Sequence, residues 1–156
     1  MPAFKTLLGF CLISFLSFIS SLPHDSANLT AYEMLEKFNF PKGILPEGVE
    51  SYVLNKDGSF EVYLSGDCTF RVAGEEYSLN YKRKISGKVA FGSLKELKGV
   101  TVKILFFWLS IGEVSRVGEE LNFYVGLLSA SFPLSNFEES PQCGRGLDFM
   151  DLVLDS

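Results

Sequence analysis

Histidine is nearly absent from this sequence, and its scarcity limits the chemistry that the chain can perform. The 156 residues include one histidine, His24, three cysteines and one tryptophan. A nucleophile activated by histidine needs that histidine beside it, and the chain has no Gly-x-Ser-x-Gly turn. One histidine and few cysteines do not make a zinc site, and no calcium-binding or phosphate-cradling motif occurs. We therefore expect no catalytic triad, no metal and no cofactor.

Positive charge is also scarce. The chain has 14 lysines and arginines against 19 acidic residues, a net charge of −5, which argues against a nucleic-acid partner. Three acidic pairs, Glu75-Glu76, Glu119-Glu120 and Glu138-Glu139, fall in turns or in the tail, where solvated charge is their ordinary role. Catalysis by two carboxylates needs one of them in an apolar pocket. We expect a binding protein, and the alternative is an extracellular hydrolase of cell-wall or lipid esters that acts through carboxylates.

The N-terminus has the layout of a secretory signal. Lys5 precedes an apolar run from Leu7 to Leu22, which ends in the small residues Ser20 and Ser21. The run is shorter than the ~20 residues of a membrane span, and an uncleaved signal anchor is the alternative. We expect residues 1–21 to be a signal peptide, so that the mature protein is secreted, extracellular and without a membrane span.

Removal of the signal changes the cysteine count. Cys11 leaves with it, and Cys68 and Cys143 remain as an even pair in a compartment that permits disulfides. We expect them to pair, and the alternative is two buried thiols that act as small hydrophobic residues. Asn28-Leu29-Thr30 is a glycan acceptor sequence near the new N-terminus, although such sequences also arise by chance.

One helix is expected near the start of the mature chain. Thr30 and Glu33 have the spacing of a capping box, and apolar residues from Ala31 to Phe38 follow at helical spacing. We place an amphipathic helix at about residues 30–39, because Pro41 disfavours helix in the residue before it.

The rest of the chain alternates between apolar and polar residues, as β-strands do. We expect strands at about 49–55, 59–65, 68–72, 77–82 and 84–91, a turn or short helical piece at 93–98, and two long strands at about 100–117 and 121–127. This pattern predicts a mainly β domain at residues 22–136, in which one N-terminal amphipathic helix packs on an antiparallel β-barrel-like or strongly curled sheet, followed by an irregular tail at 137–156.

Alternation fails in one segment, which is apolar on both faces. It comprises Ile104, Leu105, Phe106, Phe107, Trp108 and Leu109. Either the helix covers its second face, or it is a central strand buried on both sides. The functional interpretation is that Ile104, Phe106, Phe107, Trp108 and Leu109 line a groove for a lipid or another apolar molecule.

The basic residues of this acidic chain concentrate in one region, at Arg71, Lys82, Arg83, Lys84 and Lys88. Lys82 and Lys84 share one face of a strand and are candidates for contact with an anionic head group or an acidic wall polysaccharide. A solvated edge that discourages strand-to-strand aggregation is the alternative. A wall-associated interaction module without a small ligand is therefore a further functional hypothesis.

Several motifs together resemble the plant domain-of-unknown-function family DUF 538. They cover nearly all of the mature chain in order: residues 31–35, 40–49, Cys68-Thr69-Phe70, Tyr81-Lys82, Ile85-Ser86-Gly87, Leu97-Lys98-Gly99-Val100, Trp108-Leu109 and Pro141-Gln142-Cys143-Gly144. The resemblance implies a plant protein, often secreted into the apoplast, with a helix packed on an antiparallel barrel-like sheet. It also implies a proposed likeness to lipid-binding bactericidal/permeability-increasing proteins, and suggested roles in chlorophyll binding or hydrolysis.

The tail departs from the pattern of this family. Secreted members tend to have a cysteine-rich C-terminal segment, and here Ser140, Arg145 and Phe149 stand where cysteines are expected. This leaves Cys68 as the sole intrachain partner for Cys143.

Overall fold

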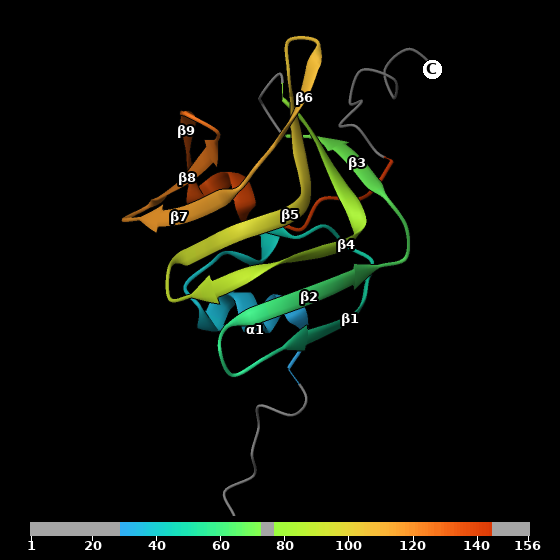
Figure 1. Ribbon diagram of the computed structural model, residues 1–156, viewed down its shortest axis with the longest axis vertical. Helices are drawn as coiled ribbons and strands as arrows, with labels where there is room; N and C mark the ends of the chain where they lie inside the picture. Colours follow the sequence, from blue (N-terminus) through green and yellow to red (C-terminus); the bar gives the residue numbers. More distant parts are fainter. Residues whose placement is uncertain (1–28, 73–76, 145–156) are drawn as a thin grey trace, which may run out of the picture.

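The computed structural model describes residues 29–72 and 77–144, which form one α-helix and a nine-stranded antiparallel sheet (Figure 1). The helix α1 spans Ala31–Lys37, and the short 3-10 helices η2 and η3 span Lys42–Ile44 and Leu134–Phe137. The strands are β1 (Val49–Leu54), β2 (Ser59–Leu64), β3 (Cys68–Arg71), β4 (Ser78–Ala90), β5 (Ser93–Ile104), β6 (Phe107–Ser110), β7 (Glu113–Val117), β8 (Glu120–Val125) and β9 (Leu128–Pro133). No helix in the described ranges is long and apolar enough to cross a bilayer. The predicted fold class is confirmed, and the sheet curls without closing into a barrel.

The long β4–β5 hairpin organises the other strands. Near its turn at residues 91 and 92, β2 and then β1 continue the sheet beside β4, while β7, β8 and β9 continue it beside β5. At the opposite end of the hairpin, β3 pairs with β4 and β6 pairs with β5. The single nine-stranded sheet therefore has two regions that share this hairpin, here called the lower sheet, β1-β2-β4-β5-β7-β8-β9, and the upper sheet, β3-β4-β5-β6 (Figure 1).

The hairpin bends where the two sheets meet. Relative to the stretch of β5 with which it pairs, β4 holds extra residues between Tyr81 and Ser86, which is a bulge. Opposite the bulge, Gly99 has a φ of 94°, and a Cβ at that position would lie 2.5 Å from the carbonyl oxygen of Lys84. A residue without a side chain is required here, both for the left-handed backbone and for the close approach.

Helix α1 forms where the sequence predicts it, and its two ends are fixed by side chains. The N–H of Thr30 donates to Oε2 of Glu33 (2.8 Å), and the N–H of Glu33 donates to Oγ1 of Thr30 (3.2 Å), so the capping box is confirmed. After the last turn, Nη1 of Arg116 in β7 donates to the carbonyl (3.1 Å) and the side-chain oxygen (2.8 Å) of Asn39. The helix is therefore tied to the lower sheet.

Tyrosine hydroxyls attach the segments on either side of α1 to the sheet. Tyr52 in β1 donates to the carbonyl of Leu29 at 2.7 Å, and Tyr81 in β4 donates to the carbonyl of Ile44. Tyr81 is buried, and this burial raises the pKa of its hydroxyl. The group is therefore a permanent donor at physiological pH.

A disulfide joins β3 to the C-terminal segment. Cys68 and Cys143 are bonded, which confirms the predicted pairing, with Cys68 fully buried and Cys143 exposed. Beside the bond, the N–H of Glu47 donates to the carbonyl of Pro141 at 2.9 Å. Residues 137–144, the described part of the expected tail, are therefore held against the loop that follows α1.

Three predictions about strands are wrong. The stretch from Ser93 to Lys98, predicted as a turn or helical piece, is the first half of β5. The two strands predicted at 77–82 and 84–91 are one strand, β4, whose bulge interrupts the alternation between them. The long strand predicted at 100–117 is three strands, since the chain turns at residues 105 and 106 and again before β7. Its first turn is made of apolar residues and carries no turn signal.

We expect Gly99→Ala to reduce the free energy of unfolding by at least about 2 kcal/mol, because the added methyl group meets both an unfavourable φ and a backbone carbonyl. Gly66→Ala is the matched control, since a Cβ at Gly66 meets nothing within 4 Å. Urea denaturation of both variants measures the difference. Equal midpoints for Gly99→Ala and wild type would show that the bend does not require glycine.

Loss of the disulfide should lower the free energy of unfolding by about 2–4 kcal/mol, because the bond closes a loop with a sequence separation of 75 residues. Cys143→Ser tests this without leaving a cavity, since Cys143 is exposed whereas Cys68 is buried. The unfolding midpoint of this variant should match that of reduced wild type. If oxidised and reduced wild type unfold together, the bond does not stabilise the fold.

Candidate apolar binding site

Two adjoining apolar spaces lie on the inner side of the curled sheet. The α1 cavity, of about 90 Å³, lies between α1 and the lower sheet. The β9 pocket, of about 270 Å³, lies between the upper sheet and the β8–β9 hairpin. Ile111 and Phe123 line both spaces. Clefts that bind small molecules have volumes of roughly 300 Å³ or more, so the β9 pocket approaches that class and the α1 cavity does not.

The β8–β9 hairpin supplies one wall of the β9 pocket through strict alternation. Phe123 pairs with Ala130 and Val125 with Leu128, and paired residues share a face of the sheet. The opposite wall comes from the upper sheet, where alternate residues of β4 and β5 face inward. The lining residues are Val72, Tyr77, Leu79, Val102, Ile104, Ile111, Phe123, Val125, Leu128, Ser129, Ala130, Phe132 and Phe137.

Four aromatic rings follow one another along this lining. The ring centroids of Tyr77 and Phe132 are 5.9 Å apart, those of Phe132 and Phe123 are 5.8 Å apart, and those of Phe123 and Phe137 are 5.6 Å apart. The first two pairs meet edge to face, which is a favourable geometry for aromatic rings. The four rings give the pocket a large apolar wall built from β8, β9, η3 and the residue that precedes β4.

The walls of the pocket carry little polar chemistry. In the described ranges no polar or charged residue is buried, and no cluster of histidine, cysteine and carboxylate side chains could hold a metal ion. The pairs Glu119-Glu120 and Glu138-Glu139 are exposed, and Glu75-Glu76 lies outside the described residues. These walls can enclose an apolar group and shield it from water.

Lys82 and Lys84, the predicted contacts of an anionic group, each lie beside a carboxylate. Nζ of Lys82 is 3.4 Å from Oδ2 of Asp67, and Nζ of Lys84 is 2.9 Å from Oε1 of Glu61. The N–H of Arg83, and then Lys82, lower the pKa of Asp67, so its negative charge persists at neutral pH. Both lysines are exposed and locally neutralised, and their contact with an anionic ligand stays a prediction.

The predicted ligand-binding segment forms the end of β5, a turn and β6. Ile104 pairs with Phe107, and Ile104 lines the β9 pocket, so Phe107 extends that apolar face beyond the rim. Leu109 pairs with Val102 and shares the same face, whereas Trp108 lies on the opposite face. The expectation that the helix covers the segment, or that it is a central strand buried on both sides, is wrong, because Phe106 is 87% exposed. Only Ile104 of the predicted residues lines the pocket itself.

The aromatic wall was not predicted as a site, although part of its signal is visible in the sequence. The strand predicted at about 121–127 contains Phe123 and Val125 at alternate positions, but it also contains Leu127, which lies in the turn before β9. Phe132 lies on β9, which the sequence did not suggest as a strand. Asn28, the predicted glycan site, and residues 1–21, the predicted signal peptide, lie outside the described residues.

The comparisons with known proteins identify a family and nothing closer. Residues 31–138 match the family model described as "Protein of unknown function, DUF538". No curated protein and no solved structure matches the chain. The matched range begins at the first residue of α1 and extends just past η3, so it includes every helix and strand described above. The chain belongs to the DUF538 family.

Proposed function

We propose that this protein is a non-enzymatic binder of a lipid or another apolar ligand, and that the β9 pocket receives the apolar part of that ligand. The observation that carries the proposal is a space of about 270 Å³ whose lining is apolar apart from Ser129 and the hydroxyl of Tyr77. Water in such a space finds few hydrogen-bond partners, so its replacement by a hydrocarbon group is favourable.

The adjacency of the two spaces favours a chain-like ligand. Phe123 stands between the β9 pocket and the α1 cavity and is only partly buried. Rotation of its ring would join the two spaces into one longer cavity lined by α1, β4, β5, β8 and β9. A hydrocarbon chain would fit such a cavity better than a compact molecule.

The location of the polar end of the ligand follows from the lining. Tyr77 contributes a side-chain hydroxyl to the β9 pocket and is only partly buried, whereas Ser129 pairs with Tyr124 and its side chain lies on the other face of the hairpin. The ligand would therefore enter with its apolar end first, and its polar end would stay near solvent. The Tyr77 hydroxyl is uncharged, so we expect weak discrimination between head groups.

We also propose that the protein is secreted into the extracellular space, the apoplast of a plant. The layout of residues 1–21 supports this, and so does the Cys68–Cys143 bond, because structural disulfides persist in oxidising compartments.

Blocking the pocket should weaken ligand binding. Ala130→Trp places a large ring on the inner face of β9, beside Phe123, without removing any core side chain. We expect its affinity for oleic acid to be about tenfold or more below that of wild type, because the ring occupies the volume of the ligand. Native mass spectrometry with oleic acid, and with a panel of phospholipids, measures the bound fraction.

Ser131→Trp is the matched control. Ser131 pairs with Asn122 on the other face of the hairpin, away from the pocket, so this variant should bind as wild type does. Trp108 is not a suitable reporter, because it faces away from the pocket. If purified wild type binds none of the lipids and solvent extracts nothing from it, the proposed function is wrong.

Secretion is tested by the mass of the protein recovered from the medium of plant cells that express the full chain. We expect the mass of a chain that lacks about the first 21 residues. If Asn28 carries a glycan, the Asn28→Gln variant should lack the mass of that glycan. Full-length protein retained in the cell would contradict the proposal.

A further inference from the structure

Several of the most exposed large apolar side chains gather on two hairpin turns. The β6 tip consists of Leu105, Phe106, Phe107 and Trp108, and the β9 tip consists of Leu127 and Leu128. Leu105 and Phe106 are 82% and 87% exposed, and Leu127 is fully exposed. Contiguous exposed apolar residues of this kind usually mark an interaction surface.

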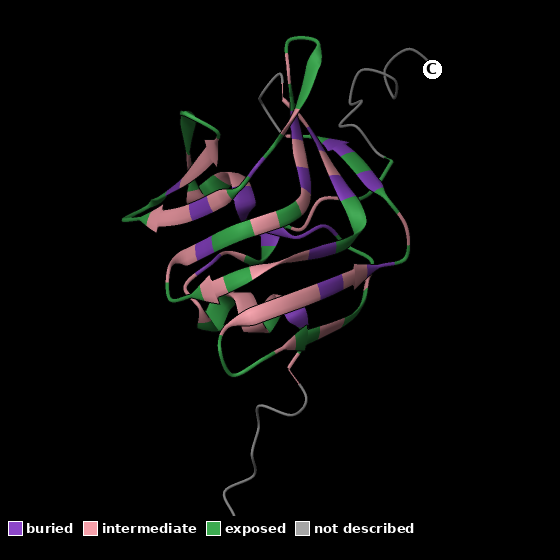
Figure 2. Ribbon diagram, in the orientation of Figure 1, coloured by how far each residue is buried: buried purple, intermediate pink, exposed green. Residues whose placement is uncertain are grey.

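Both tips lie at the same end of the molecule. Figure 2 shows them as the two exposed turns at the top of the view, far from α1. The β9 pocket links them, because Ile104, next to the β6 tip, and Leu128, in the β9 tip, both line it. Two projecting apolar turns therefore both adjoin the β9 pocket.

The sequence of the β6 tip does not suit the turn that it forms. Ile104 pairs with Phe107, so Leu105 and Phe106 form a two-residue turn, and Leu105 has a φ of 55°. Turns of this kind favour asparagine, aspartate or glycine, which tolerate that backbone and are polar or small. Leucine at this position is unfavourable both for the backbone and for solvation, and such local conflicts are typical of functional sites.

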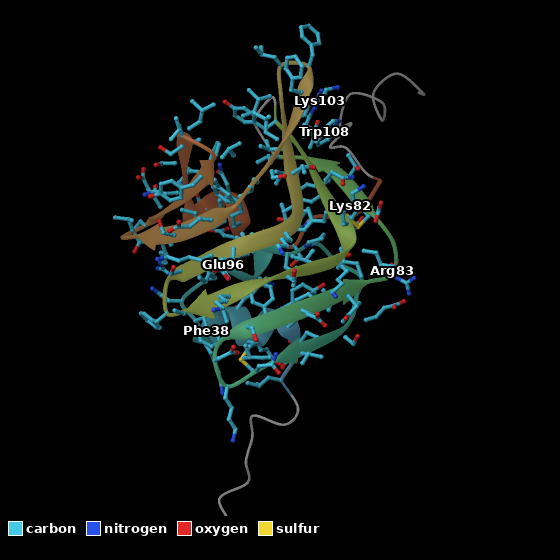
Figure 3. All side chains as sticks on the ribbon, viewed as in Figure 1. Phe38, Lys82, Arg83, Glu96, Lys103 and Trp108 are labelled. Atoms are coloured by element: carbon cyan, nitrogen blue, oxygen red, sulfur yellow. A yellow bond between two sulfur atoms is a disulfide. The ribbon has the colours of Figure 1, made fainter. Side chains whose placement is uncertain are left out.

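Basic residues accompany the β6 tip on the outer face of the upper sheet. Arg71 pairs with Ser78, Ser78 with Lys103, and Lys103 with Trp108, so these side chains form one row across four strands. Figure 3 shows Lys103 and Trp108 close together, apart from Lys82 and Arg83. Neither Arg71 nor Lys103 takes part in the two ion pairs formed within the described ranges. In an acidic chain, positive charge is thus placed beside the apolar tip.

We propose that the two tips insert into the surface of a lipid bilayer, with Trp108, Lys103 and Arg71 at the level of the head groups. Tryptophan and basic residues favour that level, and apolar side chains favour the acyl region below it. A fluid bilayer accepts two separate projections, whereas a protein partner would need a surface complementary to both. The proposal rests on the tips and stands whether or not the pocket binds a ligand.

The experiment measures binding to phosphatidylcholine vesicles with and without phosphatidylserine. Trp108 is the single tryptophan and lies in the β6 tip, so its emission should shift to shorter wavelength on binding, and brominated lipids should quench it. Leu105→Ser combined with Phe106→Ser should lower the partition coefficient by about tenfold or more, because two large apolar side chains no longer leave water.

Phe91→Ser is the matched control for the apolar effect. Phe91 is 74% exposed and lies in the β4–β5 turn, at the end of β5 away from the β6 tip, so this variant should bind vesicles as wild type does. For the charge, Lys103→Gln should reduce the preference for phosphatidylserine several-fold, and Lys95→Gln, on the distant half of the same strand, should not.

Three results would overturn the proposal. One is wild type whose Trp108 emission and sedimentation do not respond to any vesicle. Another is a tip variant that binds as tightly as wild type. The third is a wild-type protein that does not bind vesicles but self-associates as its concentration rises, with this self-association lost in the tip variant. That result would assign the tips to contact with a second copy of the chain. The pocket is blocked in Ala130→Trp. If this variant binds vesicles but not oleic acid, bilayer binding and ligand binding are independent properties.

Discussion

The close approach of Gly99 to the carbonyl oxygen of Lys84 is the constraint on which the other features depend. It lets the β4–β5 hairpin bend, and the bend lets one pair of strands serve two sheets. The lower sheet then faces α1 and the upper sheet faces the β8–β9 hairpin, so each encloses an apolar space on the same inner side. A flat hairpin would place all strands in one layer and would enclose neither space.

The sequence predicted what depends on local chemistry and missed what depends on the bend. The capping box at Thr30, the first hairpin and the Cys68–Cys143 pair follow from spacing and compartment, and all three are confirmed. The continuity of β4 was missed because a bulge exposes Lys82, Arg83 and Lys84 in succession, which ends the alternation that identifies a strand. No periodic pattern marks a strand that changes its neighbours halfway.

The sequence predicted an apolar binding site, but the structure forms the pocket mainly from other residues. An apolar run from Ile104 to Leu109 suggested a groove, and the structure instead exposes most of it and builds the pocket wall from Phe123, Phe132 and Phe137. In the sequence, these rings are well separated from β4 and β5. They share a pocket with those strands only because the bend brings β8 and β9 over β4 and β5. Aromatic residues at alternate positions look the same in the sequence whether they line a core or a pocket.

Alternation along β5 and β6 also separates the two proposed roles. Val102 and Ile104 face the pocket, while Lys103, between them, faces outward with Trp108. A ligand and a bilayer would therefore contact opposite faces of the same two strands, and a substitution on one face leaves the other face intact. Phe107 is the exception, since it shares the face of Ile104 and lies in the β6 tip. It is the residue at which the pocket lining continues into the proposed membrane-facing surface, so an apolar molecule that passed between a bilayer and the pocket would pass along its ring.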